Sequence, residues 1–196
     1  MVWDIRWWLI MQSMKKLNIE PLKVDGFSDA ENRASEDYIE SLLKEWENTP
    51  YMSGKCVKKR GVDCVHFISA IYDALLGVEH VYEPLPQDMS FHDKEKAEAG
   101  LRRMFRFYPC SGVEGDTIQP GDIVICGPIG KQGGPGHGMI AGKNSLWHVD
   151  SIGVCRSGLC VTQAGTSAFK QIRRLDDRTV YRDALKRAGI TVEGYV

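Results

Sequence analysis

The stretch DCVHFISAIYDALLG, residues 63–77, has the pattern of an amphipathic helix with a cysteine on its first turn. Asp63 is a suitable N-cap residue and Gly77 a suitable residue to end the helix. The unpaired N–H groups of a first turn favour a thiolate, so we expect them to lower the pKa of Cys64. Position alone is nevertheless more typical of a buried core cysteine than of a nucleophile. The core face consists of Cys64, Ile68, Ile71, Tyr72 and Leu75.

Residues 137–150, HGMIAGKNSLWHVD, predict a β-hairpin that brings two histidines together. If a two- or four-residue loop within residues 142–145 closes the hairpin, His137 pairs with Asp150 and Met139 pairs with His148. His137 and His148 then lie on one face as diagonal neighbours, about 7–8 Å apart at the backbone. One ring could accept the proton of Cys64 while the other fixes the tautomer of its neighbour. Asp150 lies on the same face and is an alternative orienting group.

The rest of the chain predicts an α+β fold. Helices come first and short adjacent strands follow, which is typical of helices packed on a central antiparallel sheet. We assign residues 1–27 to an N-terminal extension, with helically spaced tryptophans, and 28–196 to a single domain. Three further helices are predicted at residues 28–47, 94–107 and 176–189, and Ser28 or Asp29 would cap the first of them. A strand is predicted at residues 122–126, and loops are predicted at 51–61, 109–119 and 127–136.

Composition restricts the function. The 25 basic and 26 acidic residues leave a net charge of −1, which does not suggest a nucleic-acid partner. The N-terminal apolar run, residues 7–11, is too short for stable membrane insertion and is a poor signal peptide, so we expect synthesis in the cytoplasm. The six cysteines form no Cys-x-x-Cys pair, which gives a structural zinc site little support, and we expect neither a metal nor a cofactor.

Four segments, taken in order, resemble the NlpC family of cell-wall cysteine peptidases. They cover about residues 40–160 and match the family's Thr-Pro-Tyr and Asp-Cys-Ser-Gly-Phe segment, its Pro-Gly-Asp-Leu-Val strand, its His-Val-Gly-Ile strand and a later strand with a second histidine. The matching residues are Thr49-Pro50-Tyr51 with Asp63-Cys64-Val65-His66-Phe67, then Pro120-Gly121-Asp122-Ile123-Val124, His137-Gly138-Met139-Ile140, and Leu146-Trp147-His148-Val149.

The resemblance implies a papain-like fold and hydrolysis of amide bonds in peptidoglycan stem peptides. Cys64 would be the nucleophile, His137 its base and His148 the orienting group. Tyr51 would match the family's active-site tyrosine, and Asp63 the acid that helps to recognise the free amine of the substrate. No metal or cofactor is implied.

One subgroup of the family resembles the chain most. The segment Glu83-Pro84-Leu85-Pro86 and the lack of a secretion signal are similar to the phage-tail and gene-transfer-agent members. That similarity implies a phage-tail or secretion-machinery partner, which would deliver the enzyme to the cell wall.

The chain also departs from the family pattern. Val65-His66 replaces the usual Ser-Gly, and Gly138 stands where valine is common. His66 follows Cys64 by two positions, so we expect it off the nucleophile's face, at the rim or surface. Two alternatives therefore stay open: an acyltransferase or amidase that uses the same triad on a non-wall substrate, and a catalytically silent phage-tail or interaction domain.

Overall fold

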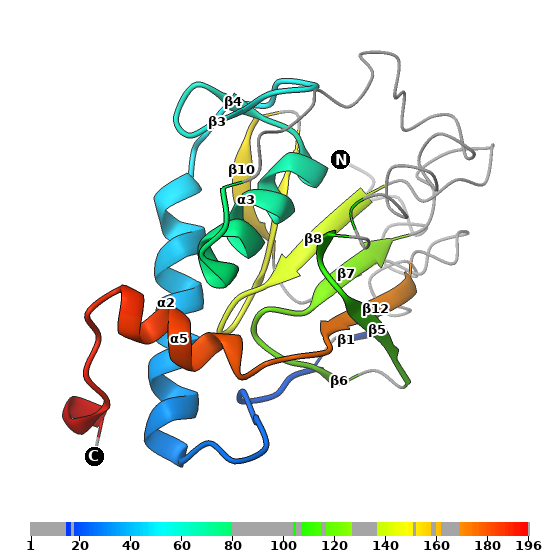
Figure 1. The fold of residues 1–196 in the computed structure, drawn as a ribbon. Helices are drawn as coiled ribbons and strands as arrows, with labels where there is room; N and C mark the ends of the chain where they lie inside the picture. Colours follow the sequence, from blue (N-terminus) through cyan, green and yellow to red (C-terminus); the bar gives the residue numbers. More distant parts are fainter. Residues whose placement is uncertain are drawn as a thin grey trace, which may run out of the picture.

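In the part of the chain that the structure describes, six strands form a central antiparallel sheet, in the order β10-β9-β8-β7-β12-β5, and three helices gather beside it (Figure 1). The computed structural model describes residues 15–16, 18–79, 104, 107–114, 117–126, 137–150, 152–157, 160–161 and 169–195. The sheet strands are β5 (Cys110–Val113), β7 (Ile123–Cys126), β8 (His137–Ala141), β9 (Leu146–Val149), β10 (Val154–Ser157) and β12 (Phe169–Leu175). This arrangement confirms the predicted α+β class.

The helices are α2 (Asp29–Trp46), α3 (Cys64–Leu76) and α5 (Val180–Arg187), followed by the 3₁₀ helix η1 (Val192–Tyr195). Helix α3 contacts both α2 and α5 and packs across β8 and β9, so the first turn of α3 lies against the strands that carry the two histidines. The described residues also form three pairs of two-residue strands: β1 (Lys15–Lys16) with β11 (Cys160–Val161), β2 (Asn18–Ile19) with β6 (Thr117–Ile118), and β3 (Cys56–Val57) with β4 (Gly61–Val62).

The predicted helix limits are confirmed for α2 and α3. Ser28 Oγ accepts a hydrogen bond from the Glu31 N–H, and the Glu31 carboxylate accepts one from the Ser28 N–H, which forms a capping box. Asp63 caps α3 by accepting from the N–H groups of the two residues after Cys64. Gly77 ends α3 in the left-handed region, with φ at 68°.

Other predicted elements need correction. The expected loop 109–119 contains β5 and β6, and the expected loop 51–61 contains β3 and the first residue of β4. These strands are only two to four residues long and too short to show a hydrophobic alternation. The expected helix 176–189 begins only at Val180, because the Asp177 carboxylate accepts from the N–H and hydroxyl groups of Thr179 in a turn before it.

Several predictions fall on residues that the structure does not describe. These are the tryptophan-rich helix at the N-terminus, most of the helix 94–107 and the loop 127–136. Within the described part of the chain, no helix is both long and apolar enough to cross a membrane.

Leu22 and Val24, which we placed in the N-terminal extension, are buried in the same core as α2 and α3.

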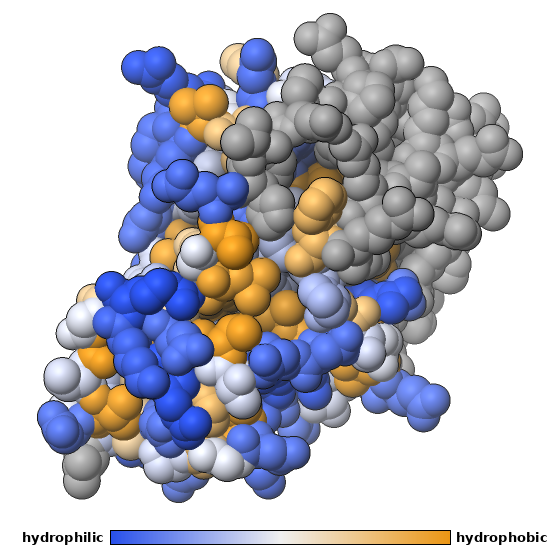
Figure 2. All heavy atoms as spheres, in the orientation of Figure 1, coloured by the Kyte–Doolittle hydropathy of each residue, from blue (hydrophilic) through white to orange (hydrophobic). Residues whose placement is uncertain are grey.

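Hydrophobic side chains gather in the middle of the face on which α3 lies, and hydrophilic ones cover α5 below them (Figure 2). The core itself is formed by side chains from α2, α3 and the sheet, including Phe67, Tyr72 and Trp147, each fully buried. Burial of such large apolar side chains stabilises each by about 1.5–3 kcal/mol relative to exposure. This core fixes α3 on the sheet and thereby fixes Cys64 relative to β8.

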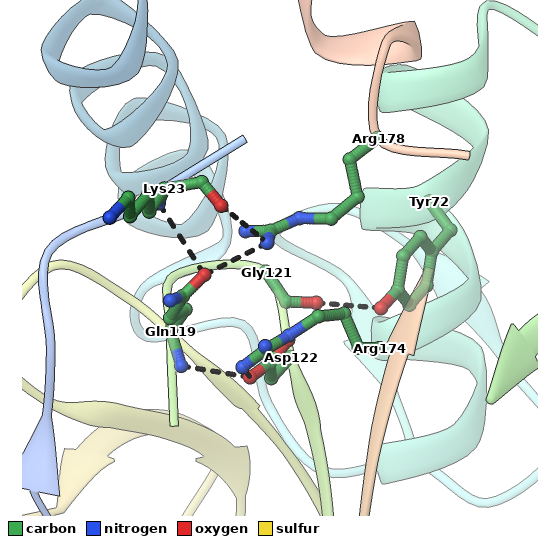
Figure 3. A network of polar contacts seen from close by, with 7 residues as sticks. All are labelled: Lys23, Tyr72, Gln119, Gly121, Asp122, Arg174 and Arg178. Atoms are coloured by element: carbon green, nitrogen blue, oxygen red, sulfur yellow. Dashed lines mark hydrogen bonds and ion pairs between the residues drawn. The ribbon is translucent and has the colours of Figure 1, made fainter. Parts of the chain in front are cut away.

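The Pro-Gly-Asp turn before β7 anchors the centre of the sheet (Figure 3). Both oxygens of Asp122, which is 1% exposed, bind the Arg174 guanidinium of β12, at 2.9 and 2.6 Å. The same carboxylate accepts from the Gln119 N–H at 2.8 Å, and the Tyr72 hydroxyl donates to the Gly121 carbonyl at 2.6 Å. The turn is thus joined to α3 and to β12, which accounts for its sequence in structural terms.

A second part of this network holds the N-terminal segment. Arg178, between β12 and α5, donates to the Lys23 carbonyl at 3.0 Å and to the Gln119 side chain at 2.8 Å (Figure 3). Residues from the two ends of the chain are therefore linked through the turn that precedes β7.

Candidate active site

Cys64 is the first residue of α3 and is only 6% exposed. Burial, and to a lesser degree the nearby Asp63 carboxylate, raise the pKa of its thiol to about 12. The backbone N–H groups of Gly138, Val65 and Cys64 itself counter this effect but do not overcome it. The expectation that the helix end would lower the pKa was therefore wrong, because desolvation exceeds the helix-end effect. Cys64 is a neutral thiol in this state.

The two histidines meet as predicted. Ile140 pairs with Trp147 and Ala141 with Leu146, which is the expected register of β8 and β9. His137 Nε2 lies 3.0 Å from His148 Nδ1, and the two rings are almost perpendicular. Burial lowers the pKa of His137 to about 4, with the His148 ring as the second cause, and burial also lowers the pKa of His148. Both rings are neutral at pH 7.

Gly138 forms the contact between the cysteine helix and the histidine strand. Its N–H group faces the Cys64 sulfur, and it directly follows His137. A β-carbon at position 138 would lie 2.9 Å from Ile68 Cδ1 of α3, so a valine there would force Ile68 to move. Glycine at this position allows the close approach of α3 to β8.

Cys64 and His137 thus lie on either side of one helix–strand contact. Among the described residues, no hydrogen bond joins the Cys64 sulfur to the His137 ring. Because His137 Nε2 is engaged with His148, Nδ1 is the nitrogen that could accept a proton from the thiol.

The structure adds Cys155, which the sequence did not single out. Cys155 pairs with His148 across β9 and β10, and its sulfur lies 3.5 Å from His148 Nε2 and 3.3 Å from Asp150 Oδ2. Asp150 also accepts from the N–H groups of Ile152 and Gly153. Asp150 therefore reaches the histidines through Cys155. The turn signal Asp-x-x-Gly at 150–153 could have predicted a third strand with Cys155 opposite His148.

Asp63 directly precedes Cys64, but Asp63 is only 3% exposed and its carboxylate is fully engaged. It binds the Val65 and His66 N–H groups, the Gly54 N–H at 2.8 Å and the His66 ring at 2.8 Å. In this structure, the residue that the resemblance gives to substrate recognition caps α3 and holds the preceding loop.

The expected surface position of His66 was wrong. The residue is 1% exposed, and its Nδ1 contacts both oxygens of Asp63. The β3–β4 hairpin folds back against α3, where the Cys56 thiol donates to the His66 carbonyl at 3.5 Å. A helical position that points away from the core is buried here because the preceding β3–β4 hairpin covers it.

Tyr51 lies at the edge of this region. Its backbone forms an isolated bridge with Val62, two positions before Cys64, while its side chain is 47% exposed. The described residues provide no hydrogen-bond partner for its hydroxyl group. Among the described residues there is also no group of three or more side chains suited to hold a metal ion.

When the chain is compared with models of known protein families and with curated proteins, none of them matches.

Proposed function

We propose that the protein is a cysteine hydrolase in which Cys64 attacks a carbonyl carbon and His137 acts as general base. The observation that carries this proposal is the contact of 3.0 Å between His137 Nε2 and His148 Nδ1. His137 lies on β8, and the N–H group of the next residue, Gly138, faces the Cys64 sulfur. A nucleophile, a base and an orienting group for the base are the parts that acyl transfer from a thiol requires.

The neutral state of both groups favours proton transfer during the attack. With the Cys64 thiol at a pKa of about 12 and His137 at about 4, an ion pair does not form at rest. Proton transfer to His137 Nδ1 accompanies formation of the C–S bond, and His137 returns that proton to the leaving amine. Water then attacks the thioester carbonyl carbon while His137 Nδ1 accepts its proton. The C–S bond breaks, the acid is released, and His137 returns the proton to the Cys64 sulfur.

The groups around the sulfur can stabilise the developing oxyanion. The N–H groups of Cys64 and Gly138 face the sulfur. The resemblance to the NlpC family suggests the hydroxyl of Tyr51, whose side chain is exposed, as a further donor. One such donor contributes about 10²–10³ in rate in enzymes that use it. Asp63 supports the site by fixing the first turn of α3.

The substrate part of the proposal rests on the resemblance to the NlpC family. We propose an amide bond in a peptidoglycan stem peptide as the target, reached after delivery by a phage-tail or secretion-machinery partner, within a papain-like fold. One observation favours a second candidate, an acyltransferase or amidase on a non-wall substrate. The Asp63 carboxylate is buried and already bound to His66, so it does not offer a free charge to a substrate amine.

The test is incubation of the full chain with purified peptidoglycan and muropeptides of several chemotypes, with mass spectrometry of the new amines. Wild type should release peptides and Cys64→Ala should not. Cys110→Ala is the control and should behave as wild type, because Cys110 lies on β5, an edge strand of the sheet. If the wild type and Cys64→Ala behave alike, the peptidase proposal fails.

Labelling with a thiol-reactive acyl probe separates the alternatives. A labelled Cys64 without muropeptide turnover favours the acyltransferase or amidase. An unlabelled Cys64 without turnover favours a silent interaction domain.

A further inference from the structure

Four polar side chains form one continuous chain across three adjacent strands. His137 Nε2 lies 3.0 Å from His148 Nδ1, His148 Nε2 lies 3.5 Å from Cys155 Sγ, and Cys155 Sγ lies 3.3 Å from Asp150 Oδ2. The residues come from β8, β9, β10 and the turn after β9. Each of these three contacts joins an atom that can donate a hydrogen bond to an atom that can accept one.

The Asp150 carboxylate, at the end of this series of side chains, fixes the direction of every hydrogen bond in it. An ionised carboxylate can only accept, so the Cys155 thiol must donate its proton to Asp150. The sulfur is then an acceptor, and His148 must donate through its Nε2–H. A neutral imidazole has one N–H, so His148 Nδ1 accepts and His137 donates through Nε2–H. His137 Nδ1 is left with a lone pair.

The protonation states that this direction requires are those expected at neutral pH. Burial opposes the charge on Asp150, but the N–H groups of Ile152 and Gly153, together with the Cys155 thiol and the His148 ring, lower its pKa. Burial, and then the hydrogen bond with Asp150, raise the pKa of the Cys155 thiol to about 11, so the thiol keeps its proton. Burial keeps both imidazoles neutral.

We propose that Cys155 is a positioning residue that links Asp150 to His148 and so holds His137 as the Nε2–H tautomer, with Nδ1 free to accept a proton from Cys64. The catalytic meaning of this arrangement rests on the proposed function. When Nδ1 takes the thiol proton, His137 keeps its Nε2–H and becomes an imidazolium, and the carboxylate at the far end of the chain favours that charge.

The chemistry of Cys155 can be separated from its volume by substitution. Cys155→Ser keeps a group that donates and accepts, so it should preserve the direction of the hydrogen bonds. Cys155→Val keeps an apolar side chain of similar size and removes both functions. Cys110→Val is the matched control, because Cys110 is a buried thiol on β5, at the other edge of the sheet.

The test is long-range ¹H–¹⁵N correlation NMR of the full chain labelled with ¹⁵N-histidine, at pH 7, which distinguishes protonated from bare ring nitrogens. Wild type, Cys155→Ser and Cys110→Val should show His137 and His148 each as a single Nε2–H tautomer. Cys155→Val should lose this single state and show mixed tautomers for His148 and His137.

Two results would overturn the proposal: a wild-type His137 protonated on Nδ1, or unchanged tautomers in Cys155→Val. If Cys155→Val does not fold, Asp150→Asn provides the same test, because its amide can donate and no longer sets the direction. The readout does not depend on substrate. A protein that cleaves no peptidoglycan but shows the predicted tautomers would refute the proposed function and leave this inference intact.

Discussion

The protein should lose stability on mild acidification, and replacing His137 with glutamine should make this loss much smaller. Burial and the neighbouring His148 ring lower the pKa of His137 from 6.5 to about 4 in the folded protein. The unfolded chain, whose histidine pKa is about 6.5, therefore takes up a proton in this range that the folded protein does not. The contribution of His137 to stability is fully present above pH 6.5 and is lost as the pH falls to about 4.

The magnitude follows from the difference in pKa. One pKa unit corresponds to about 1.4 kcal/mol, so a fall from 6.5 to about 4 corresponds to about 3 kcal/mol of unfolding free energy between pH 7 and pH 4. Glutamine retains an amide N–H that can donate to His148 but does not titrate. Glu31, whose pKa of about 2 is due mainly to its hydrogen bond with Arg182, affects both proteins equally.

The assay is urea unfolding followed by far-ultraviolet circular dichroism at pH 7, 6, 5 and 4. The free energy of unfolding of the wild type should fall by about 3 kcal/mol more than that of His137→Gln over this range. Curves that run parallel for the two proteins would refute the reasoning, because folding would then not hold the His137 ring neutral.

Three further substitutions test the framework around the site. Asp63→Ala removes the cap of α3 and leaves buried donors unpaired, so urea unfolding should show a loss of about 2–3 kcal/mol. Asp122→Asn weakens the paired hydrogen bonds to Arg174 and should cost about 2 kcal/mol in the same assay. Gly153→Ala places a β-carbon 2.4 Å from the Thr49 carbonyl oxygen at a φ of +139°, so the thermal midpoint should fall by several degrees.

Each substitution has a control. Ser28→Ala removes an exposed cap and should cost only about 1 kcal/mol, less than Asp63→Ala. Lys186→Ala breaks an exposed ion pair and should cost less than about 1 kcal/mol, below the effect of Asp122→Asn. Gly194→Ala meets no atom within 4 Å and should leave the thermal midpoint almost unchanged. Equal effects within any pair would contradict the corresponding argument.

The sequence predicted those features that depend on neighbours along the chain. Asp63 and Gly77 mark the ends of α3 because caps act over three or four residues. The register of β8 and β9 follows from the short turn between them, and it brings His137 and His148 together. The helical period likewise placed Cys64 on the core side of α3.

What the sequence could not predict depends on contacts between distant segments. The sequence does not predict a strand at residues 169–175, because β12 is defined by pairing with β7 on one side and β5 on the other. His66 is buried because a hairpin from the preceding segment covers it.

Local pattern alone therefore determined that Cys64, His137 and His148 belong to elements that could form one site. Tertiary packing decided their chemical state. Desolvation depends on every segment that covers a group, and it raises the pKa of Cys64 despite the helix end. Only the third strand brings Cys155 between His148 and Asp150, because that contact requires β10 to pair with β9.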